Sequence, residues 1–123
     1  MSKQRILVVD DDSKISALVR FILERLGGYE VVEENRAFAA VTTARKIRPH
    51  FILLDVNMPG KDGGDIANDL RKDPNFNATP IVFLTSLVGR GESGNHGGNV
   101  FLSKPVDPQL LIHTVRSLLP VAA

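Results

Sequence analysis

Five side chains with the chemistry to handle a phosphoryl group are spread along the 123-residue chain: Asp10, Asp11, Asp55, Thr85 and Lys104. Each lies at or just after the end of a short apolar run. Three neighbouring carboxylates would repel one another, and a divalent cation would relieve that repulsion. Oxygen ligands without histidine or cysteine favour Mg²⁺ over zinc. With a metal and an ammonium to neutralise phosphoryl oxygens and a hydroxyl to donate a hydrogen bond, the set suits a phosphoryl group.

The apolar runs predict the strands that must bring these side chains together. Most runs are rich in β-branched or aromatic residues, and their continuous apolarity indicates strands that are buried on both faces. The five predicted strands are Ile6–Val9, Tyr29–Val32, Phe51–Leu54, Ile81–Leu84 and Val100–Leu102.

Helical patterns alternate with these strands. Apolar residues recur at helical spacing in residues 15–26, 37–47, 66–70 and 110–118. Asp12 and Ser13 are typical N-cap residues for the first of these helices. Strands that alternate with helices predict right-handed β-α-β units and a parallel sheet covered on both faces. Ligands bind such a sheet beyond the carboxyl ends of its strands, which is where the five polar side chains lie.

One segment breaks the regular pattern. Residues 86–98 contain five of the ten glycines, although the alternation of elements calls for a helix there. Each glycine inside a helix costs ~1 kcal/mol relative to alanine. We therefore expect the fourth helix to be short, loop-like or missing.

Composition excludes several classes of function. Lys and Arg number 15 against 14 Asp and Glu, so the net charge of +1 gives no general attraction to nucleic acid or to an anionic membrane. The absence of cysteine excludes disulfides and thiol chemistry. No apolar run approaches the ~18 residues of a membrane-spanning helix, and the N-terminal run is too short for a secretory signal. A cytoplasmic protein without direct nucleic-acid binding or membrane insertion is expected.

The motifs that carry these residues resemble a known family. VVDDD at 8–12, DVNMPGKDG at 55–63, LTS at 84–86 and KP at 104–105 are similar, in order and spacing, to the receiver domain of two-component response regulators. The resemblance covers essentially the whole chain. It implies one receiver domain over residues 1–123 with a flavodoxin-like, doubly wound sheet of five parallel strands in the order 2-1-3-4-5. It also implies a signalling switch that modifies only itself, and is not an enzyme acting on other substrates.

The resemblance gives each motif residue an expected role. Asp55 would be the phosphoacceptor, which takes a phosphoryl group from the phosphohistidine of a sensor histidine kinase or of a phosphotransfer protein. Asp10, Asp11 and Asp55, with the backbone carbonyl of Asn57, would hold Mg²⁺. The downstream protein target is not identifiable from the sequence.

Further positions match parts of the family's switch. Thr85 would move toward the phosphoryl group, and Lys104 would pair with it. The peptide bond before Pro105 is often cis in the family. Phe101 stands where the family has an aromatic switch residue that turns inward on activation, although an ordinary core phenylalanine explains it equally well.

Two other interpretations compete with the receiver. A haloacid-dehalogenase-like phosphohydrolase would also carry Asp10 and Asp12 after a strand, with Thr85 and Lys104 following other strands. That family has a further acidic pair after the lysine, whereas only Asp107 is present here, and the chain is short for a substrate pocket. A receiver that no longer uses phosphate would not need the complete set of Asp55, Thr85 and Lys104. The initial Met1 and the short tail favour a stand-alone protein over part of a longer chain.

Overall fold

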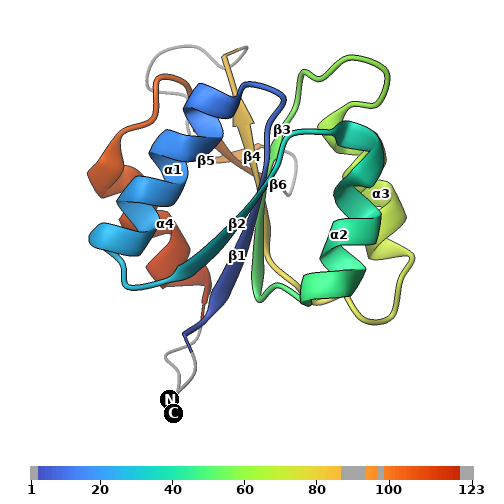
Figure 1. The fold of residues 1–123 in the computed structure, drawn as a ribbon, viewed down its shortest axis with the longest axis horizontal. Helices are drawn as coiled ribbons and strands as arrows, with labels where there is room; N and C mark the ends of the chain where they lie inside the picture. The colour runs from blue at the N-terminus through green and yellow to red at the C-terminus, as the bar shows by residue number, and fades with distance from the viewer. Residues whose placement is uncertain (1–2, 87–93, 97–98, 120–123) are drawn as a thin grey trace.

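One twisted sheet with helices on both faces forms the body of the protein (Figure 1). The structure is a computed structural model that describes residues 3–86, 94–96 and 99–119. The strands are β1 (Arg5–Val9), β2 (Glu30–Glu34), β3 (Phe51–Asp55), β4 (Ile81–Thr85), β5 (Gly94–His96) and β6 (Asn99–Ser103). The helices are α1 (Ser13–Arg25), the 3₁₀ turn η1 (Ala37–Ala39), α2 (Ala40–Ile47), α3 (Gly63–Arg71) and α4 (Pro108–Leu118).

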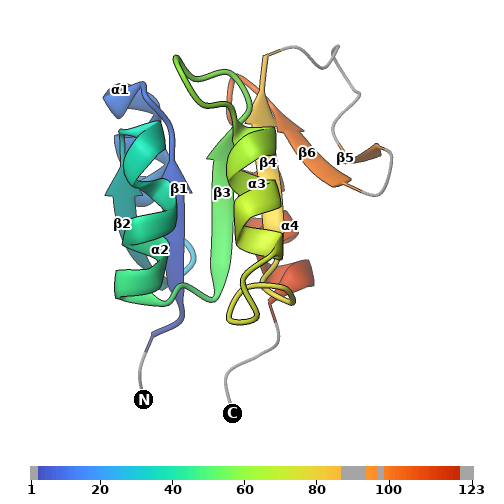
Figure 2. The same ribbon diagram turned by 90° about the vertical axis from the view of Figure 1, so that its right-hand side faces the viewer.

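The strand order confirms the predicted fold and adds one strand to it. The order across the sheet is β2-β1-β3-β4-β6-β5, and the first five of these strands are parallel. They reproduce the predicted order 2-1-3-4-5 of a flavodoxin-like sheet. The additional strand is β5, which lies last in the sheet order and pairs antiparallel with β6. It was not predicted from the sequence. Figure 2 shows it at the outer edge of the sheet, beyond β6.

The two faces of the sheet carry separate cores, which explains why the central strands β1, β3 and β4 have no polar face. Helices α1 and α4 cover one face, and α2 and α3 cover the other (Figure 1). Successive side chains of a strand point to opposite faces. In β1, Ile6 and Val8 pack with α1 and α4, whereas Leu7 and Val9 pack with α2 and α3. Each of these four residues is at most 1% exposed.

Aspartate residues begin three of the helices. Asp12, Asp62 and Asp107 are the N-caps of α1, α3 and α4, and each carboxylate accepts a hydrogen bond from a backbone N–H of the first turn. These bonds satisfy amide groups that have no partner within the helix. Of the two residues expected to cap α1, Asp12 is the cap and Ser13 is the first helical residue. The helices therefore begin directly after the loops that follow β1, β3 and β6.

Between β4 and β6, the part of the chain that the structure describes contains β5 and no helix. The expectation that the fourth helix is short, loop-like or missing concerns residues that are mostly outside this described part. Residues 87–93 and 97–98, which hold most of that segment, lie outside the described residues.

None of the described helices is long and apolar enough to span a bilayer.

Candidate functional site

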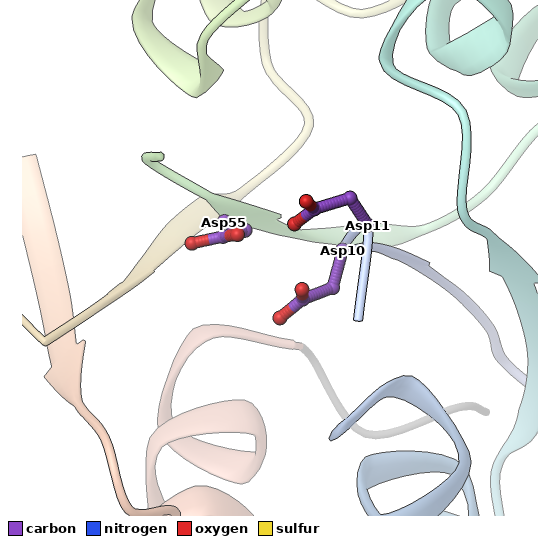
Figure 3. A group of neighbouring side chains, drawn as sticks. All are labelled: Asp10, Asp11 and Asp55. Atoms are coloured by element: carbon purple, nitrogen blue, oxygen red, sulfur yellow. The ribbon is translucent and has the colours of Figure 1, made fainter. Parts of the chain in front are cut away.

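The carboxyl ends of β1 and β3 bring three aspartates together. Asp10 and Asp11 directly follow β1, and Asp55 is the last residue of β3. One carboxylate oxygen from each residue lies within 4.8 Å of the other two. Figure 3 shows the three carboxylates gathered around one space beyond the ends of the strands. Asp10 is 0% exposed and Asp55 is 3% exposed, whereas Asp11 reaches solvent.

The Asp10 carboxylate is buried with one oxygen incompletely satisfied. Its Oδ1 accepts a hydrogen bond of 2.9 Å from the backbone N–H of Asp12. Its Oδ2 accepts no hydrogen bond of good geometry, although the Nζ of Lys104 forms an ion pair with it at 3.0 Å. Buried carboxylate oxygens are normally well hydrogen-bonded or bound to a cation. The Oδ2 atom therefore has capacity for another ligand.

Lys104 links Asp10 to Asp55. Its Nζ lies 3.3 Å from Oδ1 of Asp55, and its side chain is 17% exposed. The backbone N–H of Lys104 donates to the carbonyl of Thr85, which ties the loop after β6 to the end of β4. The Lys104–Pro105 peptide bond is cis. The ammonium thus sits between two buried carboxylates that come from different strands.

The electrostatics of the site follow from this burial. Burial and the charge of Asp10, opposed by Lys104, raise the pKa of the Asp55 carboxyl from 3.8 to about 6. Burial alone would lower the pKa of Lys104, but the Asp10 and Asp55 carboxylates outweigh it and hold that pKa above 10.5. Lys104 therefore stays charged, while Asp55 gains its full charge only near neutral pH.

This donor set fits a hard divalent cation. All three candidate ligand side chains offer oxygen, and Oδ2 of Asp10 has capacity for another ligand beside its ion pair with Lys104. When every group is ionised, the three carboxylates and Lys104 leave two net negative charges. Oxygen ligands of this charge suit Mg²⁺. Asn57 also reaches the site, where its backbone N–H donates to Oδ1 of Asp55 at 3.3 Å.

Thr85 and Phe101 lie on the neighbouring strands β4 and β6. Thr85 is the last residue of β4 and is 3% exposed. Phe101 is half-buried in the core beneath α2 and α3, and its ring stacks on that of Phe83 with centroids 5.3 Å apart. The structure thus places Thr85 at the same strand ends as the aspartates and places Phe101 two residues before the end of β6.

Comparison with protein-family models identifies the family of the domain. The family model of the response regulator receiver domain matches residues 6–116. The chain belongs to the response regulator receiver family. Its members are signalling switches, which favours this interpretation over a phosphohydrolase.

Individual proteins show the same relationship. The receiver is 41% identical over 119 residues to the response regulator PleD of Caulobacter vibrioides. The matched region covers 93% of this chain and 26% of PleD. It is 33% identical to the DNA-binding response regulator MtrA of Mycobacterium tuberculosis, over 95% of this chain and 51% of MtrA. The chain therefore spans between a quarter and a half of these relatives. The chemotaxis protein CheY4 of Vibrio cholerae superposes with a TM-score of 0.83 at 30% identity, covering 96% of this chain and all of CheY4.

Sequence reasoning missed a glycine that supports the receiver's acidic site. The Asp62–Gly63 pair has the local sequence of a turn, but Gly63 is the first residue of α3 and lies against β3. A Cβ atom on Gly63 would lie 2.5 Å from the carbonyl oxygen of Asp55. Only glycine allows α3 to begin this close to Asp55. The DG pair alone signals a turn, and no local pattern indicates the close approach.

Gly63→Ala is therefore expected to destabilise the receiver by about 2 kcal/mol, because overpacking forces the backbone to shift. The clash is with a strand carbonyl, which has little freedom to move. Gly64→Ala is the matched control, since its Cβ would meet only the Asp62 carboxylate, at 3.3 Å. Urea unfolding followed by circular dichroism measures both variants. Equal stability of the two alanine variants would show that the contact at Gly63 is unimportant.

Proposed function

We propose that this receiver accepts a phosphoryl group on Asp55 from the phosphohistidine of a sensor histidine kinase or a phosphotransfer protein. In this proposal Mg²⁺ is held by Asp10, Asp11 and Asp55 together with the backbone carbonyl of Asn57. The observation that carries the proposal is the place of Asp55. Its buried carboxylate shares one space with two other carboxylates and lies 3.3 Å from the Lys104 ammonium.

The chemistry of the step follows from the contacts of Asp55. A carboxylate oxygen attacks phosphorus, a P–O bond forms, and the P–N bond to the donor imidazole breaks with its electron pair returning to nitrogen. The product is an aspartyl phosphate. The hydrogen bond from Asn57 and the ion pair with Lys104 both involve Oδ1, and neither involves Oδ2. These two contacts orient the carboxylate and leave Oδ2 to attack.

Lys104 is suited to follow the charge as it moves. Its ammonium pairs with Asp10 and Asp55 before the reaction, and a flexible lysine can turn toward a new phosphoryl oxygen without leaving the site. A bound Mg²⁺ would neutralise charge on the phosphoryl oxygens. The Thr85 hydroxyl would donate a hydrogen bond to the same group.

We propose that Thr85 and Phe101 transmit the signal. Thr85 and Phe101 lie on the adjacent strands β4 and β6, where Phe83 and Phe101 are register partners. A movement of Thr85 toward the phosphoryl group would open space along these strands, and the half-buried Phe101 ring could turn inward to fill it. The output would be the docking of a downstream protein in the cytoplasm, without direct nucleic-acid contact by this chain.

Intact mass tests the phosphorylation directly. Incubation with acetyl phosphate and Mg²⁺ is expected to add one phosphoryl group, and incubation with acetyl phosphate and EDTA is expected to add none. An unchanged mass in the presence of Mg²⁺ would contradict the proposal.

A second assay separates the switch from a phosphohydrolase. Incubation with a generic aryl phosphate ester and Mg²⁺ is expected to release less than one equivalent of product per chain. Sustained multiple turnovers would instead favour the phosphohydrolase.

A further inference from the structure

A chain of polar side chains on the α1 side of the site holds the backbone that carries two of the aspartates. Its members are Ser16 on α1, Glu33 on β2, and Asn35, which directly follows β2. Ser16 is 0% exposed, although it is a polar residue in an amphipathic helix. None of these residues belongs to the motifs that define the acidic site.

Asn35 contacts the backbone of Asp10 directly. Its Nδ2 donates one hydrogen bond of 2.7 Å to the carbonyl oxygen of Asp10 and another of 2.9 Å to Oγ of Ser16. An amide nitrogen has two hydrogens, so both donors are used. The backbone N–H of Asp10 in turn donates to the carbonyl of Glu34, at 3.2 Å. Glu34, the last residue of β2, and Asn35, which follows it, thus form hydrogen bonds with both polar backbone groups of Asp10.

The other end of the network anchors Asn35. Oγ of Ser16 lies 2.7 Å from Oε1 of Glu33 and donates its hydrogen to that carboxylate, so it can accept from Asn35. Oε2 of Glu33 forms an ion pair with Arg20 at 3.5 Å. Hydrogen bonds to a carboxylate are stronger than those between neutral groups. Ser16 is therefore held in place, and it fixes the amide of Asn35.

We propose that Asn35 is a positioning residue for the Mg²⁺ site, acting through the peptide group between Asp10 and Asp11. That peptide group contains the carbonyl to which Asn35 donates, and its orientation sets the direction in which both side chains leave the backbone. Residues that orient metal ligands in this way usually change metal affinity by about tenfold to a hundredfold when they are removed. The inference rests on the proposed function in one respect, which is the identity of the metal as Mg²⁺. The contacts of Asn35 are independent of it.

Asn35→Ala is expected to weaken Mg²⁺ binding by about tenfold to a hundredfold. The binding is measured by titrating the full chain with Mg²⁺ alone and following backbone amide shifts by NMR. Asn35→Ser is measured in parallel, so that the test stands if the alanine variant does not fold. Its shorter side chain cannot reproduce both hydrogen bonds, and it is expected to weaken binding at least tenfold.

Thr43→Val is the matched structural control. It removes a hydroxyl that donates to Oε1 of Glu34 at 2.7 Å. Glu34 precedes Asn35 in the sequence, but the Thr43 hydroxyl itself makes no hydrogen bond to the Asp10 backbone. It is expected to lose stability in urea and to keep its Mg²⁺ affinity within twofold. The proposal is overturned if the folded Asn35 variants bind Mg²⁺ within twofold of the wild type, or if Thr43→Val loses as much affinity as they do.

The phosphorylation assay separates this inference from the proposed function. A wild type that binds Mg²⁺ but takes up no phosphoryl group contradicts the proposed function alone. Loss of Mg²⁺ affinity in the Asn35 variants would still support the positioning role. A wild type without saturable Mg²⁺ binding would overturn both.

Discussion

In Asp55→Asn, uptake of a phosphoryl group from acetyl phosphate is expected to fall below detection by intact mass. The carboxamide has nearly the same shape as the carboxylate and can still accept the hydrogen bond from Asn57, so the loop after β3 keeps its contact. It lacks the negative charge that makes the carboxylate a nucleophile. The substitution therefore removes the chemistry and leaves the surrounding structure in place.

Asp12→Asn provides the control for charge. Asp12 is exposed and lies next to the site, and asparagine is as good an N-cap as aspartate, so α1 keeps its cap. This variant is expected to take up one phosphoryl group, as the wild type does. A phosphoryl group on Asp55→Asn would place the acceptor elsewhere in the chain. Loss of uptake in both variants would mean that general charge matters more than Asp55.

The central strands could be predicted because their burial leaves a strong pattern. Each of the residues Phe51–Leu54 is 0% exposed, and no polar residue interrupts them. The strand β5 could not be predicted in the same way, since Gly94, Asn95 and His96 include no apolar residue. Its pairing with β6 comes from tertiary structure, which periodicity in one segment does not report.

Much of the candidate site could also be predicted, because parallel strands end at one edge. Asp10 follows β1, and Asp55 and Thr85 end β3 and β4, so these three residues are expected near one another. The structure brings Lys104 to the same place, within ion-pair distance of two aspartates. Their roles in phosphoryl transfer and Mg²⁺ binding stay predictions until they are tested.

The supporting residues could not be found from the sequence. Ser16 falls between the apolar residues Ile15 and Val19 of α1, and its burial is the one feature that sets it apart. Asn35 follows a strand, as many loop asparagines do. Its two hydrogen bonds join residues 19 and 25 positions away in the sequence, and local patterns carry no information about such pairs.

The crowding of carboxylates also affects stability when no metal is present. A folded-state pKa of about 6 for Asp55, against 3.8 ordinarily, means that the folded protein binds this proton more tightly than the unfolded chain does. Stability therefore falls as pH rises from about 4 to about 6, and the loss remains at higher pH. Burial of the ionised Asp55 carboxylate is the main physical reason, the charge of Asp10 adds to it, and Lys104 offsets only part of the effect.

Metal-free Asp55→Asn is accordingly expected to be more stable than the wild type by about 3 kcal/mol at pH 8, from a shift of roughly two pKa units. The difference is expected to shrink toward zero as the pH falls below about 4, where Asp55 becomes protonated in both the folded and the unfolded state. Urea unfolding in EDTA across this pH range measures it. Asp62→Asn, which changes an exposed N-cap and keeps the cap, is the control and is expected to show no comparable gain in stability at pH 8.

Mg²⁺ is expected to change the stability difference between the wild type and Asp55→Asn. A ligand that binds only the folded protein at 100 times its Kd stabilises that protein by about 2.7 kcal/mol. Asp55→Asn has lost one of the three carboxylates, so it should bind the cation more weakly and gain less. Adding Mg²⁺ at pH 8 is thus expected to remove most of the advantage of Asp55→Asn. A stability difference that is unchanged by both acid and Mg²⁺ would mean that ionisation of the buried Asp55 carboxylate does not limit the stability of the fold.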